Sequence, residues 1–151
     1  VYKYSIFWGV MKAEVISRAG VYPKLQIPYL LEAVQAGFPS PAQDYVEQQL
    51  DLNELCIKHP AATYFVRATG DSMVGAGIND NDILVVDRAL SAQAGDIIIA
   101  CWNGELTVKE LQLTPYPALL SHNPNYPPNI LPEDAELDVF GVVSHVIHRF
   151  R

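Results

Sequence analysis

Short apolar runs rich in β-branched and aromatic residues dominate the chain after Pro60, and Gly, Asn and Asp separate them. This pattern predicts strands rather than helices. Asn103-Gly104 lies between two of the runs and predicts a tight hairpin. Five prolines between 115 and 128 predict irregular structure in the loop between the last two expected strands, 118–121 and 139–150. The expected strands are residues 63–68, 83–87, 96–102, 105–113, 118–121 and 139–150. We therefore predict a mainly β domain.

A short helix and an arm are expected before these strands. Asp51 and Glu54 form a capping-box variant, which predicts a helix from Leu52 to about Lys58 that ends before Pro60. Residues 1–41 contain few sustained periodic stretches, so we interpret them as a flexible N-terminal arm and residues 42–151 as the β-rich domain. Within the arm we treat residues 1–10 as a candidate non-native extension, because Met11 is a more natural start than Val1.

Composition restricts the classes of partner. The 151 residues carry a net charge of −7 and are 50% hydrophobic, which suits one domain with a substantial core. A negative chain is poorly suited to phosphate contacts, so we expect no direct binding of nucleic acid. The apolar run at residues 4–11 is too short to span a membrane. Cys56 and Cys101 have no metal-type spacing, and we expect free thiols in a reducing cytoplasm.

Three other patterns are weak. Gly70, Gly75 and Gly77 lack the Lys-Ser/Thr of a phosphate-binding loop. Asp80, Asp82 and Asp87 lack the remaining ligands of a calcium loop. His145 and His148 are three residues apart and cannot share one face of a strand, so a zinc pair is not expected. We predict no cofactor and no metal.

The main candidate for chemistry is a serine and lysine pair. Ser72 lies in the turn Gly70-Asp71-Ser72-Met73, and Lys109 lies in an apolar strand on the same face as Thr107, Leu111 and Leu113. A lysine kept neutral by poor solvation is a base, and it could deprotonate a serine hydroxyl. Residue types alone favour a simpler interpretation, in which Ser72 only forms the turn and Lys109 is a solvated edge residue.

A candidate substrate lies upstream in the same chain. Ala36-Gly37 is a peptide bond between two small residues, and Pro39 and Pro41 exclude regular helix directly after it. This segment is typical of a cleavable loop.

The order of these features resembles the LexA/UmuD family of self-cleaving serine peptidases, and its UmuD branch in particular. The matching text covers roughly residues 33–148. It includes AGFPSP at 36–41, HP at 59–60, GDSM at 70–73, DILVVD at 82–87, LTVK at 106–109 and LDVFGVV at 137–143. The resemblance implies a LexA/signal-peptidase-like β-domain. It also implies Ser72 as nucleophile, Lys109 as general base, cleavage between Ala36 and Gly37, and the backbone amides of Asp71 and Ser72 as oxyanion donors.

The resemblance further implies a role in SOS mutagenesis. Cleavage would be stimulated by the RecA nucleoprotein filament, and the processed homodimer would serve as accessory subunit of a UmuC-type error-prone polymerase. Two alternatives remain at this point: a LexA-like self-cleaving repressor, which the short acidic arm disfavours, and an interaction module that no longer cleaves itself.

Overall fold

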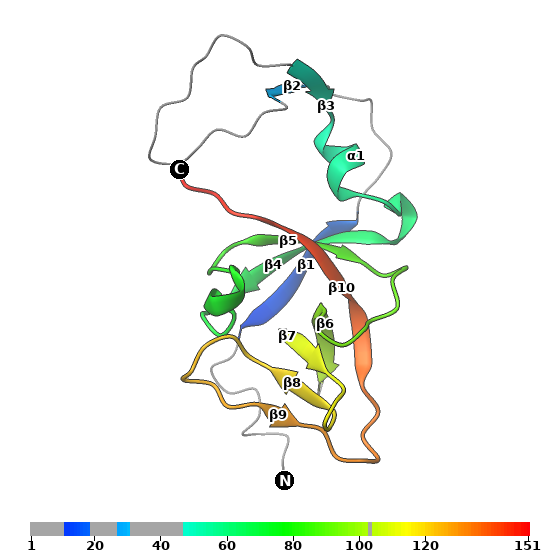
Figure 1. The fold of residues 1–151 in the computed structure, drawn as a ribbon, viewed down its shortest axis with the longest axis vertical. Helices are drawn as coiled ribbons and strands as arrows, with labels where there is room; N and C mark the ends of the chain where they lie inside the picture. Colours follow the sequence, from blue (N-terminus) through cyan, green and yellow to red (C-terminus); the bar gives the residue numbers. More distant parts are fainter. Residues whose placement is uncertain (1–10, 19–26, 31–46, 103) are drawn as a thin grey trace.

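One eight-stranded sheet forms the body of the protein in the computed structural model, which describes residues 11–18, 27–30, 47–102 and 104–151. Its strand order is β1-β4-β5-β10-β6-β7-β8-β9, and β1 also pairs with β7, so the first six strands of this order close into a barrel (Figure 1). The strands are β1 Lys12–Arg18, β4 Thr63–Thr69, β5 Ile83–Asp87, β6 Ile97–Trp102, β7 Glu105–Gln112, β8 Ala118–Leu120, β9 Asn129–Ile130 and β10 Asp138–Ile147.

A smaller unit lies between barrel strands β1 and β4 in the sequence. Strands β2 (Ile27–Leu30) and β3 (Glu47–Leu50) pair antiparallel with each other. Helix α1 (Leu52–Cys56) follows, and the Asp51 side chain caps it by accepting a hydrogen bond from the Asn53 amide. A 3-10 turn, Pro60–Ala62, then leads into β4.

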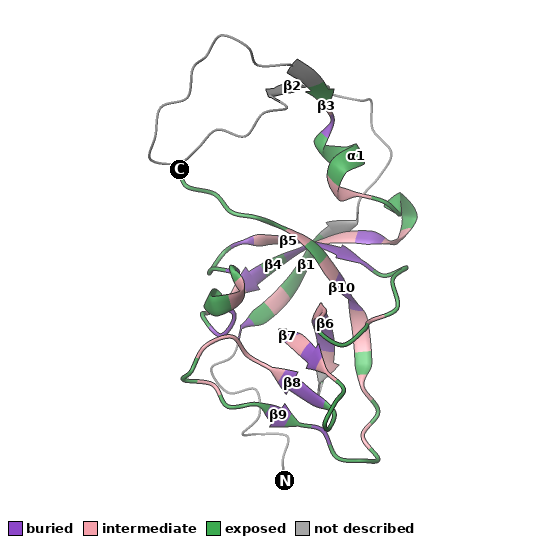
Figure 2. Ribbon diagram, in the orientation of Figure 1, coloured by how far each residue is buried: buried purple, intermediate pink, exposed green. Residues whose placement is uncertain are grey.

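The sheet encloses two clusters of buried apolar residues, visible as the buried strand segments in Figure 2. The larger cluster contains Met11, Met73 and Val108 together with residues of β4, β5 and β6. The smaller one contains Ile98, Leu111 and residues from β8, β10 and the loop after β9. Val108 and Leu111 belong to different clusters, so strand β7 contributes to both. Lys109, which follows Val108 in the middle of β7, is itself buried in this interior.

The six strands expected after Pro60 are confirmed, with small differences at their ends. The hairpin is confirmed as well, because Trp102 pairs with Glu105 and Gly104 has a positive φ of 77°. Strand β10 ends at Ile147 rather than at residue 150, and α1 ends at Cys56 rather than near Lys58. The helix is the element whose length differs most from the prediction in relative terms, because it has a single turn.

The sequence interpretation did not foresee strands β1, β2, β3 and β9. Strands β1 and β2 lie in the expected arm, and β9 lies in the loop that was expected to be irregular. The sequence interpretation placed residues 12–18 in a flexible arm, whereas the structure pairs them with β4 from Lys12 to Arg18, with a bulge between Val15 and Ser17. The segment KAEVISR has no clean alternation, and it gains its partner only when β4 is in place. The expected cleavage site lies outside the described residues.

Candidate active site

Ser72 lies in the loop between β4 and a 3-10 turn at Val74–Ala76. Its side chain is fully buried, and its Oγ accepts a hydrogen bond of 2.8 Å from the Met11 amide. Gly70 begins the loop with φ of 103°, a conformation that residues with a Cβ rarely adopt, and its amide donates to the Asp80 side chain. The turn therefore presents the serine hydroxyl inward rather than to solvent.

Lys109 projects from the middle of β7 and is also fully buried. Its Nζ donates a hydrogen bond of 2.6 Å to the Ser121 hydroxyl. Burial, which disfavours the charged ammonium, lowers the pKa of Lys109 from 10.5 to about 8. The burial of Lys109, Thr107 and Leu111 favours the poorly solvated interpretation of the lysine over the solvated one. Leu113, which was expected on the same face, lies beyond the end of β7 and is exposed.

Two bridges connect the neighbourhoods of Ser72 and Lys109. On one side, Met11 donates its amide to Ser72 Oγ, and its carbonyl accepts a hydrogen bond of 2.8 Å from Thr107, two residues before Lys109. On the other side, the Ser121 hydroxyl contacts Lys109, and the next amide, that of His122, donates to the Ser72 carbonyl at 2.8 Å. The fold therefore places the serine loop and the middle of β7 against the same two short segments.

The second bridge belongs to a longer contact that we call the clasp segment, residues 121–126. Besides the His122 amide, the Asn123 side chain donates to the Asp71 carbonyl at 3.0 Å and the Tyr126 hydroxyl donates to the Asp71 carboxylate at 2.6 Å. The acceptor Asp71 raises the pKa of the exposed Tyr126 hydroxyl through this hydrogen bond. The clasp segment thus holds the backbone of the nucleophile loop at several points.

Gly75 allows this close approach. Its amide donates to the His122 carbonyl at 2.8 Å, and a Cβ at position 75 would lie 2.6 Å from that carbonyl oxygen. Any larger residue would push the clasp segment and the serine loop apart. Gly75 was one of three glycines that superficially resembled a phosphate-binding loop. Its presence is explained instead by the close packing of the serine loop against the clasp segment.

The backbone amides of Asp71 and Ser72 are the expected oxyanion donors. Among the described residues, no hydrogen bond uses the N–H of Asp71 or of Ser72 as donor. Both groups are thus able to donate to a developing negative charge next to Ser72. The structure brings Asp71, Ser72 and Lys109 into one region, whereas Ala36 and Gly37 lie outside the described residues.

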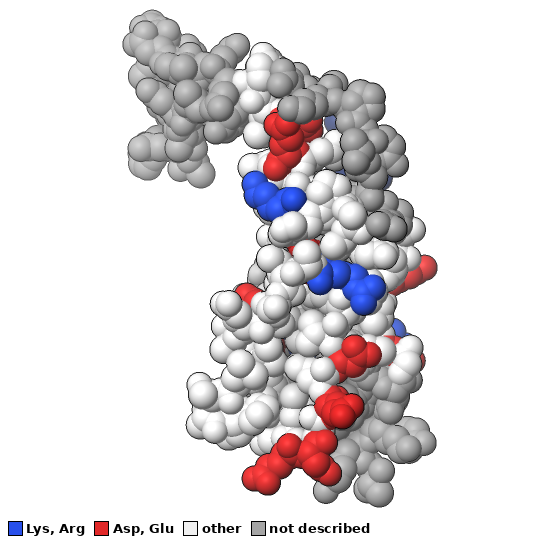
Figure 3. Space-filling view, turned by 90° about the vertical axis from the view of Figure 1, so that its right-hand side faces the viewer, with Lys and Arg blue, Asp and Glu red and all other residues white. Residues whose placement is uncertain are grey.

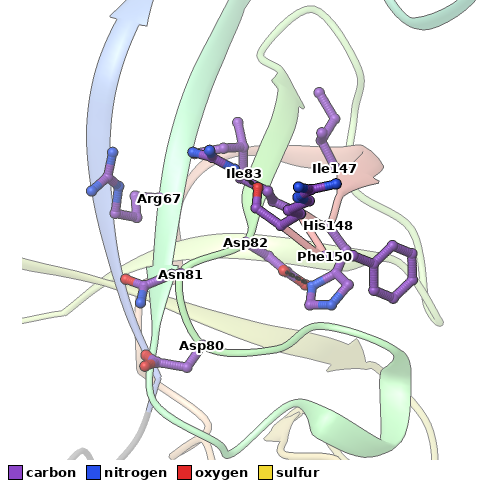
Figure 4. Close-up of a pocket in the computed structure, with 10 residues that line it drawn as sticks. Arg67, Asp80, Asn81, Asp82, Ile83, Ile147, His148 and Phe150 are labelled. Carbon is purple, nitrogen blue, oxygen red and sulfur yellow. Dashed lines mark hydrogen bonds and ion pairs between the residues drawn. The ribbon is translucent and has the colours of Figure 1, made fainter.

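A separate hollow of about 800 Å³ lies at the end of β10 (Figure 4). His148 contacts the buried Asp82 there, and the His148 ring packs edge-on against the exposed Phe150. Arg67 from β4 lies on the opposite side of the hollow. Neither Ser72 nor Lys109 lines it, so it is distinct from the serine and lysine region.

The surface charge and the potential metal ligands of the described residues indicate no second functional site. On the face shown in Figure 3, basic side chains occur in small groups separated by acidic ones. In the described part of the chain, no group of three or more His, Cys, Asp or Glu residues could hold a metal ion. No helix within the described ranges is long and apolar enough to cross a membrane.

Sequence reasoning missed three residues of this region: Met11, Ser121 and His122. The sequence indicates Met11 only as a natural start for the chain, within the expected arm, and Ser121 only as the end of an ordinary strand. Their roles depend on contacts across 61 residues for Met11 and 12 residues for Ser121, and no local pattern encodes such contacts.

The comparisons with known proteins agree with this architecture. The profile of the family described as Peptidase S24-like matches residues 28–144. Protein MucA of Escherichia coli is 44% identical over 136 residues, which cover 89% of this chain and 93% of MucA. Protein ImpA of Shigella flexneri is 55% identical over 130 residues, covering 82% of this chain and 85% of ImpA. LexA repressor 1 of Pseudomonas syringae pv. tomato is 36% identical over 118 residues, covering 77% of this chain and 58% of the repressor.

Proposed function

Because the chain belongs to the peptidase S24-like family and is UmuD-like, we propose that it is a serine peptidase that cleaves its own Ala36-Gly37 bond. The observation that best supports the proposal is the state of Lys109. A fully buried lysine with a lowered pKa is costly to the fold, and it lies against the segment that also holds Ser72. Such a loss of stability is expected at a site where the reaction needs a neutral amine as base.

The reaction follows from these groups. Neutral Lys109 accepts the Ser72 hydroxyl proton as Ser72 Oγ attacks the carbonyl carbon of Ala36. The carbonyl oxygen becomes an oxyanion, to which the amides of Asp71 and Ser72 donate. The carbon–nitrogen bond then breaks, and the Gly37 nitrogen leaves with the proton from the Lys109 ammonium. Water, deprotonated by Lys109, hydrolyses the ester on Ser72 and restores both side chains.

The contact of Met11 is compatible with this step. Its amide occupies one lone pair of Ser72 Oγ, which leaves the hydroxyl proton and the other lone pair for reaction. Tethering supplies the substrate at high effective concentration, so a cleft that binds free peptides poorly is sufficient. The small side chain of Ala36 requires only a small pocket beside the nucleophile.

We further infer that the cell uses this cleavage in SOS mutagenesis. The proposal rests on the UmuD-like character of the chain, and the net charge of −7 supports protein partners over free DNA. The RecA filament would favour the cleavable pose of the arm, and the processed homodimer would act in the cytoplasm with a UmuC-type polymerase. A LexA-like repressor is disfavoured because the acidic chain would have to bind an operator.

Substitutions at the cut should stop processing without affecting the domain. We expect Ala36→Asp and Gly37→Glu each to block cleavage, because added bulk and charge obstruct attack on the bond. Intact mass measured during incubation should show no product. The chain offers a matched control in Ala19-Gly20, a second bond of the same composition. Ala19→Asp and Gly20→Glu should leave cleavage unchanged, and the wild-type product should begin at Gly37. Another first residue would refute the placement of the cut.

The processed protein should be a homodimer that ignores free duplex DNA. The reason is the apolar run 138–147, whose exposed residues include Ile147, combined with the acidic surface. The sample should come from self-cleavage rather than from expression of 37–151, because strand β1 lies before the cut and pairs with β4. Sedimentation should give a dimer mass, and DNA titration at physiological salt should show no binding. A monomer with tight duplex binding would favour a repressor role.

A further inference from the structure

We propose that Ser121 is a positioning residue of the self-cleavage reaction, whose hydroxyl holds the Lys109 amine in place relative to Ser72. The inference rests on the proposed function, and it concerns a residue that neither the serine motif nor the lysine motif contains. Ser121 lies just after β8, and its Oγ accepts the 2.6 Å hydrogen bond from Lys109 Nζ.

A long side chain needs such a contact. Lysine has four rotatable carbon–carbon bonds, and packing of its stem alone leaves freedom at the amine. Misplacement of a reacting group by about 1 Å can cost about a hundredfold in rate. The hydroxyl of Ser121 removes that freedom while leaving the nitrogen lone pair of the neutral amine available, because the amine donates an N–H to Ser121.

The position of Ser121 in the chain adds a second argument. The residue after it, His122, donates its amide to the Ser72 carbonyl, so adjacent residues hold the base and the nucleophile loop. The His122 side chain also contacts Glu110, which follows Lys109 on β7. The dipeptide Ser121-His122 therefore contacts both the base and the nucleophile loop. A shift of the clasp segment would move the two together.

Ser121 is not itself a catalytic residue. Its hydroxyl attacks no bond of the substrate and only accepts a hydrogen bond from the base. Its oxygen does accept a stronger hydrogen bond from the ammonium than from the amine, so it stabilises the charged form. The charged groups of the surrounding segments already have partners, since Glu110 contacts His122 and Asp71 accepts from Tyr126. Loss of the hydroxyl should therefore lower the pKa of Lys109.

The test uses the full chain and three variants, Ser121→Ala, Ser121→Thr and Ser144→Ala. Self-cleavage without any activator is followed by intact mass from pH 6 to 11. We expect Ser121→Ala to lower the plateau rate about ten- to a hundredfold and to move the midpoint of the pH profile to lower pH. Ser121→Thr, which keeps the hydroxyl, should recover most of the rate. Ser144→Ala is the matched control, because Ser144 lies in β10 and its Oγ donates to the Val85 carbonyl of β5, away from Lys109, and it should behave as wild type.

A second measurement is independent of cleavage. In the Ser72→Ala background, which cannot cleave, the Lys109 pKa is read by NMR titration with and without Ser121→Ala. We expect a lower pKa in the double variant, with thermal midpoints that match.

An unchanged plateau rate in Ser121→Ala would overturn the proposal. So would an equally slow Ser121→Thr with an unmoved profile, which would indicate a merely structural role. A wild-type chain that never cleaves at any pH would instead refute the proposed function, and the titration would still report on the contact.

Discussion

Lys109→Ala should reduce self-cleavage by at least about a thousandfold while the domain stays folded, because the proposed base is then absent and the Met11 amide, which donates to Ser72 Oγ, cannot take its proton. Ser72→Ala should have a similar effect, since it removes the nucleophile. The two losses should not add in the double variant, because the residues act in one step. Intact mass after prolonged incubation gives the residual rate.

Lys109→Arg is the more discriminating substitution. Guanidinium keeps its proton at any workable pH, so the arginine variant should fail as completely as alanine although its length and charge resemble lysine. Lys58→Ala and Ser91→Ala are suitable controls, because both residues are exposed, and they should cleave at the wild-type rate. A Lys109→Ala protein that still cuts normally would refute the assignment of the base.

The strands of the barrel could be predicted because their residues carry a local signal. The run ILVVD becomes β5, and Asn103-Gly104 indicated the hairpin whose second strand carries Lys109. The neighbours of Lys109 on its strand face left a buried and a solvated lysine both open, and the structure shows it buried. Sequence therefore predicted the scaffold, and it offered the buried lysine only as one of two interpretations.

The connections across the site could not be predicted in the same way. Strand β1 depends on the edge of β4, and the segment that forms it lacks a regular apolar pattern. Ser121 and Met11 reach the site through tertiary contacts, and neither sits in a motif with a mechanism of its own. The roles of Ser72 and Lys109 stay a prediction, as does the cut at Ala36-Gly37, because those roles concern a reaction rather than a fold.

The arrangement of β1 bears on what cleavage does. Met11 is buried in the larger apolar cluster, and its backbone contacts Ser72 and Thr107, yet it precedes the proposed cut. Cleavage would thus sever the covalent connection between β1 and the rest of the sheet while leaving its pairing with β4 in place. A partner of the processed protein would meet a sheet that either keeps or loses β1. The apolar contacts of Met11 favour retention of this strand on the sheet.

The pH dependence of cleavage should reveal the same lysine. With a Lys109 pKa of about 8, the neutral fraction falls about tenfold for each pH unit below that value, so spontaneous cleavage should be about a hundredfold slower at pH 6 than on its plateau above pH 8. The rate should be measured without activator in buffers of constant ionic strength. A rate that is flat from neutral to strongly alkaline pH would count against a lysine base.

The stability of the fold should change with pH in the corresponding sense. The folded pKa is lowered from 10.5 to about 8, so between these values the unfolded chain binds more protons than the folded one. The free energy of unfolding should therefore rise as pH increases from 8 to 10.5, by about 3 kcal/mol from this lysine, and the full cost is present below pH 8. Denaturant unfolding of Ser72→Ala, which stays intact, compared with Ser72→Ala/Lys109→Met should show this rise only in the protein that keeps Lys109.

The methionine variant should also be the more stable of the two at pH 7, because no ammonium is then buried. An equal pH dependence in both proteins would mean that Lys109 is charged in the folded state at neutral pH without cost, and the argument for a neutral base would fail.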